Sequence, residues 1–214
     1  MMNDYEKAIE NYVLSHSTPE DNILAELNRV TFLKAIYPRM LSGPMLGKLL
    51  EFLSFMLKPK YILEIGTFTG YSAICLAKGL SVGGKLITIE KNDEIIKFSS
   101  NYFQKSGLSD KIELLVGDAL EIVPSLDYQF DLVFIDAEKK EYVDYYSLVI
   151  DKIRPGGFII ADNVLWDGKV LDKVKYTDKE TKGIRAFNEL ISKDPRVENI
   201  IIPIRDGISI IRKI

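Results

Sequence analysis

Short apolar runs alternate with longer amphipathic stretches over most of the chain. The first five runs have the length of buried parallel strands and lie at about 61–65, 85–89, 112–116, 131–135 and 157–161. Apolar residues recur at helical spacing in the stretches at about 92–106, 119–125, 141–153 and 182–192. Two last runs, 197–202 and 207–211, lie close together and predict a terminal hairpin. This alternation predicts an α/β fold with helices on both faces of a mostly parallel, seven-stranded sheet.

Helical periodicity also precedes the first strand. We expect one helix at about 5–13 and a third at about 44–57. The second should begin after residues 17–20, with Thr18 as its cap and Pro19 at its first position. The 214 residues fit a single domain, 1–214, in which a helical cap (1–58) precedes a nucleotide-binding core (59–214).

The stretch 61–77 is a strand, a glycine turn and a helix, which is typical of the entry to a nucleotide-binding unit. Gly66 and Gly70 bracket the turn, and Glu90 closes the next strand about 20 residues later, where a ribose diol is bound. Phe68 stands where a dinucleotide site needs bare backbone against a pyrophosphate. The pattern therefore favours a nucleoside without phosphates, of which S-adenosylmethionine (SAM) is the commonest.

Residues 64–72, EIGTFTGYS, resemble the first motif of the catechol and caffeoyl-CoA O-methyltransferase family, which are cation-dependent class I methyltransferases. The resemblance extends from about Arg39 to Arg212 and includes PIRDG at 203–207. It implies a Rossmann-like sheet of order 3-2-1-4-5-7-6, SAM as cofactor and a homodimer. The cofactor-binding residues that it implies are Met40, Ser42, Glu64, Gly66, Tyr71, Ser72, Glu90, Asp118, Ala119 and Asp136. Residues 39–43 can equally be a plain interhelical loop, and Asp118 can also cap the next helix.

Polar residues follow the fourth and fifth predicted strands, as DAEKKEY at 136–142 and DNVLWDG at 162–168. Neighbouring strand tips would bring Asp136, Asp162 and Asn163 together as three oxygen donors. Such donors, without His or Cys nearby, suit Mg²⁺, and also Mn²⁺ or Ca²⁺. Each acid alone could be a loop cap, but together the two segments closely resemble the metal-binding motifs of the family.

Lys139 resembles the general base of the family, which takes the proton from the attacking hydroxyl. For this role we expect a nearby cation and partial burial to lower its pKa. Lys140 is adjacent, so the assignment depends on the motif register. Glu138 departs from the plant caffeoyl-CoA enzymes, which have Asp there, and Trp166 and Tyr142 can be walls for a flat substrate or core residues.

The composition and charge of the chain exclude several kinds of binding site and several cellular settings. A net charge of −3 gives no basic footprint for indiscriminate nucleic-acid binding, and the single cysteine excludes an internal disulfide. The only histidine, His16, is far along the chain from the strand tips, which argues against zinc. The N-terminus is acidic and polar, and no apolar run approaches a membrane span, so we expect a cytoplasmic protein without membrane contact.

The combined interpretation is O-methylation of a vicinal dihydroxy aromatic by SAM with a divalent cation. The alternative within the family is methylation of 5-hydroxyuridine in tRNA, with Lys169, Lys173, Lys175 and Lys179 as a local basic patch. A nicotinamide oxidoreductase is disfavoured because G-x-G-x-x-G is absent. A non-catalytic binding module is disfavoured because Lys139 and the predicted metal ligands are all present.

Overall fold

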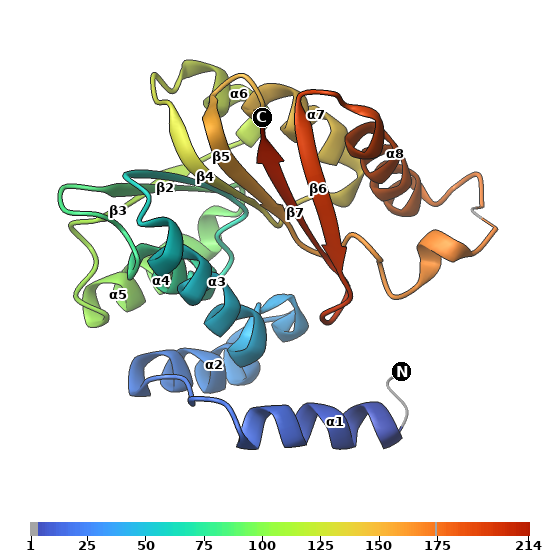
Figure 1. The fold of residues 1–214 in the computed structure, drawn as a ribbon. Coiled ribbons are helices and arrows are strands. Elements are labelled where there is room, and N and C mark those ends of the chain that lie inside the picture. Colours follow the sequence, from blue (N-terminus) through green and yellow to red (C-terminus); the bar gives the residue numbers. More distant parts are fainter. Residues whose placement is uncertain (1–3, 174) are drawn as a thin grey trace.

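One seven-stranded sheet runs through the molecule, with helices on both faces (Figure 1). The computed structural model describes residues 4–173 and 175–214. The strands are β1 (Tyr61–Ile65), β2 (Lys85–Glu90), β3 (Ile112–Val116), β4 (Phe130–Ile135), β5 (Ile153–Ala161), β6 (Val197–Ile202) and β7 (Ile208–Lys213). Their order is β3-β2-β1-β4-β5-β7-β6; the first five are parallel, and β7 is antiparallel to β5 and β6. The predicted fold and strand order are confirmed.

The helices divide between two apolar cores because side chains alternate across each strand. Leu63 and Ile87 pack under α6 (Ala119–Ser125), α7 (Tyr142–Val149) and α8 (Lys179–Lys193). Ile62 and Leu86 point to the other face, which is covered by α2 (Asn22–Lys34), α3 (Gly43–Leu57), α4 (Tyr71–Ala77) and α5 (Ile96–Lys105). The remaining elements are α1 (Asp4–Ser15) and the short 3-10 helices η1 (Pro38–Met40), η2 (Asp93–Ile95), η3 (Lys139–Glu141) and η4 (Lys169–Leu171).

The start of α2 corrects the sequence prediction. Thr18 and Pro19 precede the helix instead of beginning it, and Asp21 is its N-cap. The Asp21 carboxylate accepts hydrogen bonds from the Ile23 and Leu24 amides at 3.0 and 2.9 Å. Because one carboxylate satisfies two of the free amides of the first turn, the helix begins four residues after Thr18.

The boundary between α7 and β5 also differs from prediction. We expected a helix to residue 153, whereas α7 ends at Val149 and β5 begins at Ile153. The cause is strand pairing, since the Phe130 amide donates to the Lys152 carbonyl at 2.8 Å. Similarly, α8 begins at Lys179, three residues before the predicted start at 182, and the segment before it contains η4.

The apolar stretch Pro38–Leu57 is long and apolar enough to cross a membrane by length and composition alone, contrary to the prediction that no run approaches that length. In the structure it forms η1 and α3, and α3 packs closely on α4. A β-carbon at Gly47 would fall 2.4 Å from the Tyr71 ring, and the Ser54 hydroxyl donates to the Leu76 carbonyl at 2.6 Å. This stretch therefore contributes one face of the protein's own core.

Candidate active site

A cavity of about 780 Å³ opens at the carboxyl ends of β1, β2, β4 and β5. This is within the usual range of about 300–1,000 Å³ for small-molecule sites. All the predicted site residues except Glu64 line it, namely Met40, Ser42, Gly66, Tyr71, Ser72, Glu90, Asp118, Ala119, Asp136, Lys139, Asp162 and Asn163. Its position agrees with the rule that parallel sheets bind ligands at their strand tips.

The two glycines of the turn after β1 lie where a side chain would collide with neighbouring atoms. Gly66 has a φ of 98°, and a β-carbon there would lie 2.1 Å from the backbone oxygen of Asp136. Gly70 caps α4 with a φ of 87°, and a β-carbon there would lie 2.5 Å from the Phe103 ring. The two glycines are thus required by close packing as well as by backbone conformation.

Glu90 is held at the end of β2 by two backbone amides. The amides of Phe68 and Asn92 donate to its two carboxylate oxygens at 2.7 and 2.9 Å. Phe68 adopts a φ of 47° in making this bond. The carboxylate keeps further lone pairs for hydroxyl donors in the cavity, which is the chemistry that a ribose diol requires.

Asp118 has the capping role considered for it, and it also lines the cavity. Its carboxylate caps α6 by accepting from the Leu120 amide at 2.9 Å, and it pairs with the Lys91 ammonium at 2.7 Å. The hydrogen bond from Lys91, followed by the one from the Leu120 amide, lowers the pKa of Asp118. Together with Ala119 it forms one wall of the cavity.

Glu64 lies behind the cavity instead of lining it, since its side chain is completely buried. The Thr88 hydroxyl donates to one carboxylate oxygen at 2.5 Å, and Thr67 and Thr88 share a second bond of 2.5 Å. The other oxygen of Glu64 has no partner among the described residues. Burial raises the pKa of Glu64 to about 8.

Tyr71 and Ser72 begin α4 at the cavity wall. The Tyr71 hydroxyl is occupied by Glu20, whose carboxylate accepts its hydrogen bond at 2.5 Å. Tyr71 therefore ties α4 to the segment before α2.

Met40 and Ser42 bring the segment around η1 over the cavity, where Met40 stays more than half exposed and Ser42 is buried. This segment is tied to the β6–β7 turn, because the Arg205 guanidinium donates to the Leu41 carbonyl at 3.0 Å. Arg205 itself has a left-handed backbone, with a φ of 52°. Arg205 and Asp206 of this turn also line the cavity. The sequence predicted no role for either residue.

The acidic residues after β4 and β5 meet as predicted. Ile135 pairs with Ala161 at the last position of the two strands, so Asp136 and Asp162 follow neighbouring tips. Asp162 is 2% exposed, and burial together with the facing Asp136 carboxylate raises its pKa.

Asn163 follows Asp162 directly and lines the same cavity. It has a φ of 60°, and its side-chain nitrogen lies 3.5 Å from an Asp206 oxygen. Within residues 4–173 and 175–214, no three His, Cys, Asp or Glu side chains form a metal-binding cluster.

Lys139 points into the cavity and is 8% exposed. Its ammonium donates to Asp136 at 2.8 Å and to the Tyr142 hydroxyl at 3.0 Å, and it lies 5.9 Å from the Trp166 ring centre. Burial disfavours the ammonium, as expected, but the Asp136 carboxylate and the Tyr142 hydroxyl together outweigh burial. The pKa of Lys139 is therefore raised above its ordinary range and not lowered as predicted.

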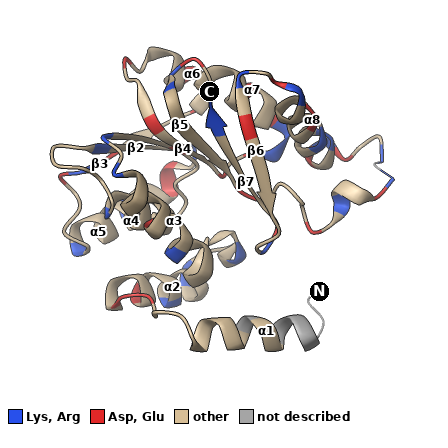
Figure 2. Cartoon of the chain, in the orientation of Figure 1, with Lys and Arg blue, Asp and Glu red and all other residues tan. Residues whose placement is uncertain are grey.

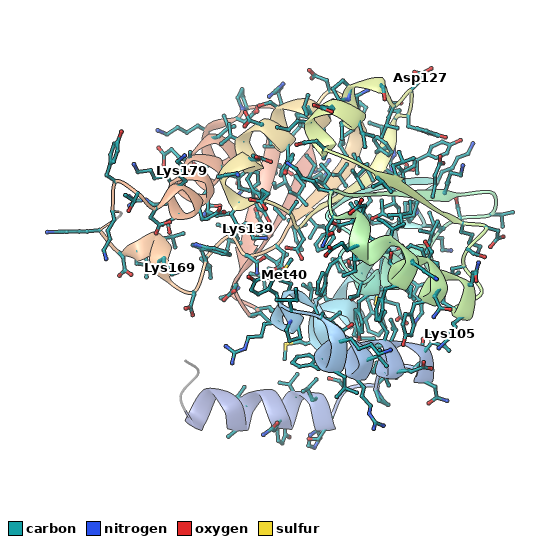
Figure 3. The ribbon with its side chains drawn as sticks, turned by 180° about the vertical axis from the view of Figure 1, so that it is seen from behind. Met40, Lys105, Asp127, Lys139, Lys169 and Lys179 are labelled. Carbon is teal, nitrogen blue, oxygen red and sulfur yellow. The ribbon has the colours of Figure 1, made fainter. Side chains whose placement is uncertain are left out.

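The neighbouring Lys140 turns away from these groups. Its side chain is 43% exposed and its ammonium lies 3.5 Å from Glu138. Figure 3 shows Lys139 in the middle of the molecule, with Met40 on one side and Lys169 and Lys179 on the other. The motif register therefore selects the lysine that faces the cavity.

Helix α8 packs against η3, the short helix that begins with Lys139. Gly183 of α8 packs on η3 so closely that a β-carbon would fall 2.4 Å from the Lys139 carbonyl oxygen. The sequence showed Gly183 only as a residue of an amphipathic helix, because this contact joins segments more than 40 residues apart.

Comparison with known proteins agrees with this geometry. A family model described as O-methyltransferase matches residues 14–214. The catechol O-methyltransferase of Niastella koreensis is 33% identical over 207 residues, which cover 94% of this chain and 92% of that protein. The caffeoyl-CoA O-methyltransferase of Eucalyptus gunnii is 32% identical over 219 residues, covering 97% and 88%.

Solved structures give the same result. An O-methyltransferase from Bacillus cereus in complex with SAH superposes with a TM-score of 0.90 at 33% identity, over 97% of both chains. The O-methyltransferase TomG from Streptomyces achromogenes, in complex with SAM, superposes with a TM-score of 0.89 at 31% identity, over 99% of both. The chain belongs to the O-methyltransferase family, and it is a SAM-dependent O-methyltransferase.

Proposed function

We propose that the acceptor is a small aromatic molecule with two vicinal hydroxyl groups, and that a divalent cation assists the reaction. The observation that carries this proposal is the position of Lys139, which shares one cavity with two acidic strand tips and the cofactor-binding turn. Trp166 adds a flat apolar surface beside the Lys139 ammonium. The similarity to a catechol O-methyltransferase supports the same class of acceptor.

Asp136, Asp162 and Asn163 fit a divalent cation. Two carboxylates that face each other at a buried edge repel, and the raised pKa of Asp162 records that repulsion together with burial. Hard oxygen donors of this kind suit Mg²⁺, and also Mn²⁺ or Ca²⁺. When bound, the cation supplies positive charge that stabilises a phenolate oxygen of the acceptor and offsets the charge of Asp136.

Lys139 is the residue that we assign to the acceptor proton. An aromatic hydroxyl with a pKa of about 10 is mostly protonated at neutral pH and is a poor nucleophile. Lys139 Nζ can accept this proton only as a neutral amine, so the ammonium must first release a proton to water. A bound cation would favour that release by offsetting the charge of the Asp136 carboxylate. The cavity contributes rate as well, since it holds the methyl donor and the acceptor oxygen in one orientation.

The test is methyl transfer from labelled SAM to catechols such as caffeate, with Mg²⁺ and with EDTA. We expect product that EDTA removes. Lys139→Met should lower kcat by about 10²–10⁴-fold with SAM affinity retained, whereas Lys140→Met is the matched control and should change little. Product that persists in EDTA would contradict the cation, and equal effects of the two lysine variants would contradict the assignment of Lys139.

The tRNA acceptor has weaker support. Lys169, Lys173, Lys175 and Lys179 are exposed beside the cavity, as that alternative requires. Four acids are interleaved with them, namely Asp167, Asp172, Asp178 and Glu180, and both signs of charge alternate along this loop (Figure 2). This mixed charge favours a small acceptor, and hypomodified tRNA in the same assay would decide the question.

We also propose that two copies of the chain form a homodimer. Large apolar side chains are exposed on the N-terminal helices and on the edge strand β6, among them Tyr12, Phe32, Leu33, Ile36, Phe52, Phe55, Met56 and Ile200. A second copy would remove this surface from water. Light scattering after size exclusion should give twice the chain mass, and a monomer at micromolar concentration would contradict the proposal.

A cytoplasmic location stays a prediction from the sequence.

A further inference from the structure

Tyr142, the first residue of α7, lies under the reactive end of the cavity and is completely buried. Its hydroxyl has three polar neighbours. Lys139 Nζ donates to it from 3.0 Å, and it faces the backbone carbonyls of Asp162 at 3.0 Å and Ile135 at 3.3 Å. A phenol has one proton to donate and lone pairs to accept with, so it bonds to a carbonyl and to the ammonium at once.

We propose that Tyr142 is a positioning residue for Lys139, which it holds at a fixed point relative to the tips of β4 and β5. This inference rests on the proposed function of Lys139. Tyr142 is itself held in place, because its ring packs edge-on against Phe187 at 5.5 Å and its hydroxyl lies between the carbonyls of Ile135, at the end of β4, and Asp162, which follows β5. The hydroxyl therefore fixes the position of Lys139 Nζ relative to the ends of β4 and β5.

A lysine needs such a partner because its long, flexible side chain otherwise samples many rotamers. Among the described residues, Nζ of Lys139 has two hydrogen-bond partners, Asp136 and Tyr142. Asp136 is also proposed to bind the cation, whereas Tyr142 is not, so the position of Tyr142 does not depend on the cation. With two of its three N–H bonds directed at these groups, Nζ presents its third position to the cavity.

A purely structural role must be distinguished from positioning. Removing the hydroxyl leaves the Asp162 carbonyl without its bond from Tyr142, which lowers stability whatever the role of Tyr142 in catalysis. Tyr146 is the matched control, since it lies one turn later on α7, is buried, and donates its hydroxyl to Asp194 at 2.8 Å outside the cavity. Tyr142→Phe and Tyr146→Phe thus lose comparable hydrogen bonds at different places.

The first measurement is kcat and KM for both variants with SAM and a catechol. Tyr142→Phe should lower kcat at least tenfold and leave both KM values within threefold, whereas Tyr146→Phe should keep kcat. In a Lys139→Met background, Tyr142→Phe should cause no further loss, because the residue acts through that lysine. An unchanged kcat in Tyr142→Phe, or an equal further loss in the double variant, would overturn the inference.

The second measurement does not depend on turnover. Acetylation of lysines, followed by mass spectrometry, should modify Lys139 several-fold faster in Tyr142→Phe than in the parent protein, with exposed Lys140 as the internal reference. An unchanged Lys139 rate would contradict positioning even in a parent protein that methylates no catechol. Absence of turnover in the parent with the expected labelling result would instead reject the proposed acceptor alone.

Discussion

At the level of single residues, Gly66 shows how closely two segments of the site are packed. The backbone of Asp136 occupies the place that a β-carbon of Gly66 would take. The glycine turn after β1 and the segment that follows β4 are therefore in close contact, so a side chain at Gly66 would displace the backbone of Asp136.

Gly66→Ala should lower the free energy of unfolding by about 2 kcal/mol or more and weaken SAM binding at least tenfold, because of overpacking at a left-handed backbone. Gly107→Ala is the control, since Gly107 has a φ of 69° and open space around it. It should show the backbone penalty of about 1 kcal/mol alone. Urea unfolding and calorimetry would measure both, and equal losses in the two variants would contradict the packing argument.

Glu64 should make stability depend on pH. Burial raises its pKa to about 8, so the folded protein keeps a proton that the unfolded chain releases near pH 4.5. The free energy of unfolding should therefore fall as pH rises from about 4.5 to about 8, by at most about 1.4 kcal/mol per pH unit, and level off above that window.

Glu64→Gln should remove this component, and the exposed Glu121→Gln should not. Urea unfolding of the cofactor-free protein at several pH values would measure the slope. The same slope in the parent and in Glu64→Gln would show that Glu64 is ionised in the folded state.

At the scale of elements, α2 begins later than the sequence predicted, with Asp21 as its N-cap in place of Thr18. Asp21→Ala should lower the free energy of unfolding by about 1 kcal/mol, because two amides lose their acceptor and Lys78 loses an ion pair of 2.7 Å. Thr18→Ala should leave stability unchanged. Thermal unfolding of both variants would decide, and the reverse order would restore Thr18 as the cap.

The elements that the sequence predicts best are those with a local cause. Apolar runs and glycine turns located all seven strands, and the resemblance of the two acidic segments located Lys139, Asp136 and Asp162. Contacts across long stretches of chain left no such local pattern. Arg205 reaches back to Leu41, and Tyr142 bonds to Asp162, so neither role can be deduced from spacing.

For the whole molecule, ligand binding should appear as stability. SAM at about 100 times its Kd should raise the free energy of unfolding by about 2.7 kcal/mol, which for a chain of this size shifts Tm by about 5–11 °C. Lys139→Met should keep this shift, whereas Glu90→Ala should lose most of it. A lost shift in Lys139→Met would mean that the lysine supports the cofactor pocket.

The cavity floor and its rim differ in burial. Asp162, after β5, and Ser72, at the start of α4, are buried in the floor, whereas Ile36, Tyr37 and Met40 are exposed on a segment outside the sheet. Under the proposed function, substitutions at the rim change which acceptor fits and leave the methyl donor in place. Substrate range can therefore evolve, or be engineered, through a few surface positions while the chemistry of the enzyme is inherited unchanged.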